Sequence, residues 1–115
     1  MSVIAIVNIE ISNMEKHIQS GYVSHAGSTV TQYGGTYLVR AGNTVVIEGD
    51  PKPARVILIE FDSMENFNKW YDSDEYAPWK KVRHRLAKND MFVVEALSRY
   101  AVSYKQLKLP TILIV

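Results

Sequence analysis

The sequence contains no cysteine. Disulfide bridges, thiolate nucleophiles and cysteine-based metal sites are therefore excluded. Long apolar runs are also lacking, because the run from Val3 to Val7 has no basic segment before it and is too short for a signal peptide or a membrane span. There is no excess of one charge either, since a net charge of +1 favours neither nucleic acid nor a membrane. We therefore expect a cytoplasmic protein with no membrane partner.

The length and composition indicate one folded domain. A chain of 115 residues, 47% of them hydrophobic, is too short for two domains with separate cores. We expect the domain to span residues 1–98 and residues 99–115 to form a C-terminal extension. The extension ends in the apolar run from Thr111 to Val115. It should therefore pack on the domain or on a partner subunit.

Runs of β-branched residues predict four strands, at residues 2–11, 36–41, 54–61 and 91–97, with residues 45–48 also extended. Between the first two strands, an apolar residue recurs every three or four positions. One helix is therefore predicted there, from a cap at Asn13 to a stop at Gly34 and Gly35.

A second helical region is predicted after the cap at Asp62 and Ser63. It breaks at Ser73, resumes to about Lys88, and is followed by a turn at Asn89 and Asp90. The order is then β-α-β-β-α-β, which predicts an α+β, ferredoxin-like fold with a four-stranded antiparallel sheet.

The first and third strands do not alternate between apolar and polar residues. A sheet with helices on one side only should alternate, because its other face is wet. Something apolar must therefore cover that second face. A second copy of the sheet is the simplest cover, which predicts a homodimer, and the C-terminal extension is the rival cover.

Three segments carry a resemblance to a known family. They are Tyr33–Arg40 followed by Glu48-Gly49, then Arg55–Ser63, and then Trp70–Tyr76 continuing to Asp90. Their order and spacing resemble the family catalogued as domain of unknown function 1330, a group of small dimeric α+β barrel proteins. The resemblance covers about residues 1–97. It implies the same ferredoxin-like fold and a homodimer, and it implies no established reaction.

Glu60 and Arg40 are the candidate catalytic residues. Glu60 lies between Ile59 and Phe61, so its carboxyl group should be desolvated and suited to acid/base chemistry. Arg40 ends the second strand, where a guanidinium could grip a substrate carboxylate. The alternative is a structural ion pair between these two residues.

Further residues are candidates for binding a substrate. Trp70, Tyr71 and Tyr76 flank the helix break, where their rings suit either the wall of a pocket or the core. Arg83 or Arg85, in the basic run of the second helical region, could reach an anionic ligand. The remaining candidates are Tyr37 and Glu48, which lie near Arg40 along the chain, and His25, which could face a pocket between helix and sheet.

Metal and nucleic-acid binding are not expected. His17, His25 and His84 are isolated, without the close histidine pairs of metal sites. The basic run at residues 80–88 lacks interleaved aromatic residues and lies where the helix dipole favours cations anyway.

The sequence thus predicts a homodimeric, small-molecule-binding protein with an anionic or aromatic ligand. Related dimeric barrels act on small aromatic metabolites. By analogy, this protein could be an enzyme that acts on small aromatic or carboxylic metabolites, with Glu60 as the acid/base. Many of those barrels need no cofactor, so none is expected here. The alternative is a non-catalytic binding or assembly module in which Glu60 and Arg40 pair.

Overall fold

The computed structural model describes residues 1–97, and the predicted extension at residues 99–115 lies outside the described residues. The elements of the described part are β1 (Val3–Ile11), α1 (Met14–Ser20), α2 (Tyr22–Gln32), β2 (Thr36–Arg40), β3 (Arg55–Phe61), α3 (Met64–Tyr71), α4 (Ala77–Leu86) and β4 (Ala87–Glu95). The strands form one sheet in the order β2-β3-β1-β4, and every neighbouring pair is antiparallel. This is the predicted α+β, ferredoxin-like fold.

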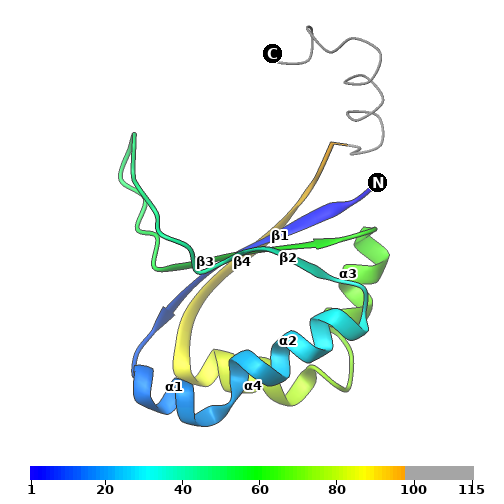
Figure 1. The fold of residues 1–115 in the computed structure, drawn as a ribbon, viewed down its shortest axis with the longest axis horizontal. Coiled ribbons are helices and arrows are strands. Elements are labelled where there is room, and N and C mark those ends of the chain that lie inside the picture. Colours follow the sequence, from blue (N-terminus) through cyan, green and yellow to red (C-terminus); the bar gives the residue numbers. More distant parts are fainter. Residues whose placement is uncertain (98–115) are drawn as a thin grey trace, which may run out of the picture.

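The helices lie together on one side of the sheet (Figure 1). The side chains of β1 that face them are buried, and those at the alternate positions are mostly half-buried. The core joins this face of the sheet to α2 and α3 and contains Val3, Ala5, Ala26, Val30, Ile59, Phe61, Phe67, Trp70 and Tyr76. Burial of these side chains is the main stabilisation of the fold, at about 1.5–3 kcal/mol for each large one.

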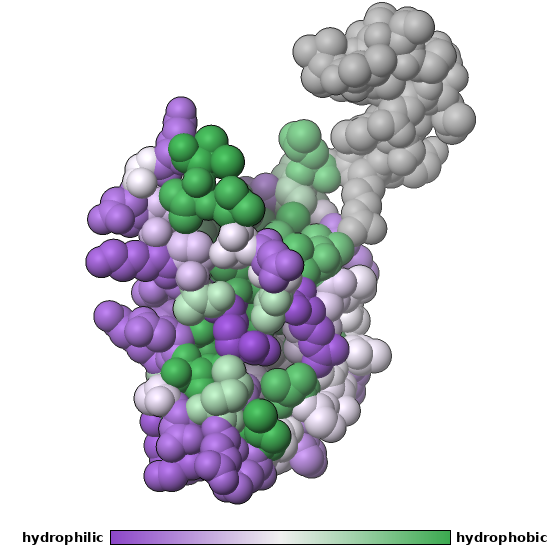
Figure 2. All heavy atoms as spheres, turned by 60° about the vertical axis from the view of Figure 1, so that its left-hand side comes forward, coloured by the Kyte–Doolittle hydropathy of each residue, from purple (hydrophilic) through white to green (hydrophobic). Residues whose placement is uncertain are grey.

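The other face of the sheet, which we call the open face, has no helix of residues 1–97 over it (Figure 1). The strand register brings apolar side chains together on it, namely Ile4, Ile6, Leu58, Phe92 and Val94. Phe92 is 60% exposed and Val94 is 46% exposed. Figure 2 shows apolar patches interspersed among polar groups on the surface of the molecule.

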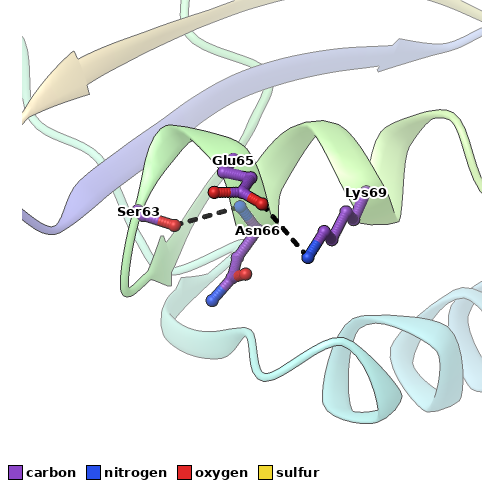
Figure 3. A network of polar contacts seen from close by, with 4 residues as sticks. All are labelled: Ser63, Glu65, Asn66 and Lys69. Carbon is purple, nitrogen blue, oxygen red and sulfur yellow. Dashed lines mark hydrogen bonds and ion pairs between the residues drawn. The ribbon is translucent and has the colours of Figure 1, made fainter.

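The starts of α1 and α3 are fixed by side-chain caps as the sequence predicts, whereas α2 and α4 have no side-chain cap. Asn13 accepts a hydrogen bond from the Lys16 amide at the start of α1 (3.0 Å), and Ser63 accepts one from the Asn66 amide at the start of α3 (3.1 Å). Glu65 also pairs with Lys69 one turn later, at 3.3 Å (Figure 3). None of the helices within residues 1–97 has the length and apolar character that crossing a membrane requires.

Two predicted features are wrong, and residues 45–48, predicted to be extended, do not join the sheet. The first helix is two helices, because Gly21 adopts a left-handed backbone (φ 74°) that ends α1. Residues 45–48 form no strand and belong to the long connection between β2 and β3, which projects from the sheet (Figure 1). Residues Asn89 and Asp90 form no turn, because the chain passes directly from α4 into β4 at the extended residue Ala87.

Gly35, which directly precedes β2, packs closely against the core, and this contact leads to a stability prediction. A Cβ atom on Gly35 would lie 2.6 Å from Val30 Cγ1 and 2.9 Å from the Phe61 ring. Gly35→Ala should therefore overpack the core and lower the free energy of unfolding by about 1–3 kcal/mol in a urea titration. Gly42→Ala is the control, since its nearest neighbour would be 3.8 Å away. Equal effects of the two substitutions would contradict the close packing of Gly35 against Val30 and Phe61.

Candidate functional site

A small cavity lies between the sheet and the helices. Its volume is about 30 Å³, which is space for about two water molecules. Strands supply the apolar floor, and α2, α3 and α4 supply aromatic and charged side chains. The lining residues are Val7, Ile9, Tyr22, Tyr37, Ile57, Ile59, Trp70, Tyr76, Arg83 and Met91.

Arg83 is the charged group of this cavity and is only 2% exposed. It lies on α4 seven positions after Tyr76 and four after Trp79, so it shares the face of the helix that turns inward. Its Nε donates a hydrogen bond to the Tyr76 hydroxyl at 3.1 Å. Its Nη1 is buried and has no hydrogen-bond partner. Within residues 1–97, no carboxylate lies within 4.0 Å of the guanidinium.

Two tyrosines extend the hydrogen bonding of Arg83 along the cavity. The hydroxyl groups of Tyr76 and Tyr22 are hydrogen-bonded to each other at 2.8 Å. Burial raises the pKa of Tyr22 far above its ordinary value, and the neighbouring Tyr76 raises it further. Tyr22 is therefore a neutral hydrogen-bonding group at physiological pH. The three side chains form one polar wall in an otherwise apolar cavity.

Aromatic rings form the rest of the wall that the helices supply. The Trp70 ring is stacked on Tyr76 with centroids 4.3 Å apart. The Trp70 indole N–H donates to Thr29 Oγ1 at 3.0 Å, so the position of the ring is fixed. Such a flat, rigid wall suits an aromatic ligand.

Two more polar atoms near the Ile9 end of the cavity are buried without a hydrogen-bond partner. They are Nδ1 of His17 and Oδ1 of Asn89. Asn89 is paired with Ile9 in the sheet, and the His17 ring lies 5.8 Å from that of Tyr22. Burial lowers the pKa of His17, and the positive charge of Arg55 lowers it further. The polar atoms that lack partners are thus concentrated around this part of the cavity.

The two predicted catalytic residues are not brought together. Glu60 is paired with Ile4 and Thr36, which places it on the open face. A bulge between Tyr37 and Val39 adds one residue to β2, so Arg40 is paired with Ile57 and lies on the helix side. There its guanidinium covers the Tyr37 ring at 4.4 Å. The geometry therefore supports neither a joint site nor an ion pair of Glu60 with Arg40.

Four of the predicted binding residues, Tyr37, Trp70, Tyr76 and Arg83, meet at the cavity. The other three do not. Tyr71 is stacked on Phe67 outside it, and Glu48 is exposed in the connection between β2 and β3. His25 is exposed and stacked on Trp79, with ring centroids 4.2 Å apart.

Sequence reasoning missed Tyr22 as a member of the site. The periodicity placed it on the inner stripe of a helix, where it counted only as a core residue. Its polar hydroxyl group was the available signal, because a buried tyrosine needs a hydrogen-bond partner. No group of three or more acidic or histidine side chains in residues 1–97 is placed to hold a metal ion.

Comparisons with known proteins agree with this fold. A family model described as "Domain of unknown function (DUF1330)" matches residues 2–97. No curated protein sequence matches the chain. The structure of methylated RPA0582 is similar, with a TM-score of 0.67 and 12% identity over 85% of this chain and 82% of that one. RPA0582 is a protein of unknown function from Rhodopseudomonas palustris.

A second similar structure is that of SnoaB from Streptomyces nogalater, described as a cofactor-independent oxygenase. The TM-score is 0.62 and the identity 11%, over 84% of this chain and 94% of that one. At such low identity the likeness establishes the fold and nothing further.

The burial of Arg83 leads to a prediction about stability. Arg83→Met removes the charge but keeps a long side chain, and Tyr22 and Tyr76 remain bonded to each other. Because an unpaired buried charge is costly, the free energy of unfolding should stay the same or rise by about 1–2 kcal/mol. The exposed Lys81→Met on the same helix is the control. A loss of about 3 kcal/mol or more, confined to Arg83→Met, would mean that the charge is paired within the protein.

Proposed function

The chain belongs to the family described as domain of unknown function (DUF1330), and we propose that it binds a small aromatic or carboxylic molecule between its helices and its sheet. Arg83 binds the acidic group of that molecule, and the rings of Trp70 and Tyr76 contact its flat body. The single observation that carries the proposal is the buried guanidinium of Arg83, whose Nη1 has no partner.

Charge is the first argument for an anionic ligand. A buried cation with no counter-ion costs several kcal/mol, and a protein tolerates that cost where a ligand later compensates it. The arginine fork matches a carboxylate in geometry and forms strong, charge-assisted hydrogen bonds. Tyr22 beside it is neutral, so it adds a hydroxyl group without a competing negative charge, and it is hydrogen-bonded to Tyr76.

The fold is the second argument. SnoaB, which shares this fold, is described as a cofactor-independent oxygenase. A reaction on the bound molecule without a cofactor is therefore part of the proposal. Ligand pockets usually exceed about 300 Å³, so a cavity of about 30 Å³ must enlarge when the molecule enters.

Glu60 is not the acid or base for a ligand bound at Arg83. Glu60 is paired with Ile4 on the open face, across the sheet from Arg83 and its cavity. A general acid or base must lie within hydrogen-bond reach of its substrate. For a ligand at Arg83, the neighbouring side chains are Tyr22 and Tyr76, which can hold it as hydrogen-bonding groups.

Salicylate, an aromatic carboxylate, is a suitable probe for this site. We expect saturable binding by calorimetry and a rise in the melting temperature of the wild-type protein. Arg83→Met should weaken the binding about tenfold or more, because a hydrogen-bonded charge pair is lost. Arg85→Met removes an exposed cation of the same helix and should leave it unchanged. Binding that is absent, or equal in both variants, would refute the proposal.

We also propose that two copies associate through their open faces. Phe92 and Val94 are exposed there beside half-buried Ile4, Ile6 and Leu58, and such a contiguous apolar surface is unusual on a monomer. Two-fold packing of identical faces would cover all of them at once.

The homodimer is tested by sedimentation at micromolar concentration. The wild type should show twice the chain mass of 13.1 kDa. Phe92→Asp should show the mass of a single chain, because a carboxylate in an apolar interface is strongly unfavourable. Ile18→Asp is the control, since Ile18 is as exposed (70%) but lies on α1, on the helix side. A wild-type protein with the mass of one chain would contradict the dimer.

A further inference from the structure

A shallow groove lies outside the cavity, between α2 and β2. Its volume is about 540 Å³, and it is open to solvent. The lining residues are Ser24, Gly27, Ser28, Thr31, Tyr37 and Arg40. The groove therefore has hydroxyl groups on one side and a cation on the other. It is large enough for a molecule that the small cavity could not admit.

Tyr37 is the one residue that lines both the groove and the cavity. It is half-buried on β2, opposite Ile59 of the cavity floor. Burial raises the pKa of its hydroxyl group, the neighbouring Arg40 cation lowers it, and Tyr76 raises it again. The Tyr37 side chain is thus the wall between the two spaces.

Arg40 covers this wall from outside. Its guanidinium carbon lies 4.4 Å from the centre of the Tyr37 ring, and its Nη2 donates one long hydrogen bond of 3.3 Å to the Val23 carbonyl. Gly27 makes the position accessible, because a Cβ atom there would lie 3.1 Å from Arg40 Nη2. Arg40 is exposed and held by few contacts, so its displacement costs little.

We infer that the groove is the entry subsite of the cavity, and that Tyr37, covered by Arg40, is a gate through which an anionic aromatic molecule passes. The inference rests on the proposed binding role of the cavity. Arg40 attracts the anion at the groove, the Tyr37 ring swings outward, and the acidic group moves on to the unpartnered Nη1 of Arg83. With Tyr37 displaced, the two spaces join into one pocket of ordinary size.

The gate can be tested without any ligand, through quenching of Trp70 fluorescence by acrylamide. The chain has two tryptophans, so a Trp79→Phe background leaves Trp70 as the single tryptophan, which is excited at a wavelength that tyrosine does not absorb. Trp70 is 2% exposed and lines the cavity, so acrylamide reaches it only by entering. In this background, Tyr37→Ala should raise the bimolecular quenching constant severalfold. Arg40→Gln, which removes only the cover, should raise it by less.

Val7→Ala is the matched control, because Val7 lines the cavity from the centre of β1 and does not line the groove. It enlarges the interior without opening it. Iodide then tests the charge of the entry: in the Tyr37→Ala protein, Arg40→Gln should reduce quenching by iodide but not by acrylamide. Equal quenching in the Tyr37→Ala and Val7→Ala proteins would overturn the gate, as would iodide quenching that is independent of Arg40. Failure of salicylate to bind would refute the cavity's role separately.

Discussion

The candidate binding site depends on the buried positive charge of Arg83. Arg83 is buried on α4, where its Nε bonds to Tyr76, its Nη2 lies 3.4 Å from His84 Nε2, and its Nη1 has no partner. Fold stability alone does not favour such an arrangement, because an apolar side chain of similar length would fill the space without a desolvation cost. A ligand anion that completes the pair would explain why an arginine occupies this position.

The two faces of the sheet have different proposed roles, namely ligand binding and association. On the helix side, the floor of β1 and β3 meets the aromatic residues of α2, α3 and α4 around the cavity. On the open side, Phe92 and Val94 expose apolar surface, which is where we propose that a second copy packs. Because side chains alternate along each strand, the two surfaces share a backbone but no side chain. Ligand binding and association should therefore be separable by mutation.

The sequence was sufficient to predict the element order and the sheet, because apolar periodicity and capping residues are local signals. It also singled out Trp70, Tyr76 and Arg83, which the structure brings together at the cavity, while their role in binding stays a prediction. It failed where one residue changes the geometry: Gly21 divides a helix, and the bulge after Tyr37 moves Arg40 to the other face. A bulge has little local signature, yet a shift of one residue inverts the side on which every later side chain lies.

The most direct measurement is a crystal structure of the protein grown with salicylate. The account predicts a carboxylate within hydrogen-bond distance of Arg83 Nη1, the ring against Trp70, and Tyr37 turned out toward the α2 groove. A carboxylate of the protein itself bonded to Arg83, from either copy, would contradict it. So would salicylate bound elsewhere while Arg83 keeps its present surroundings.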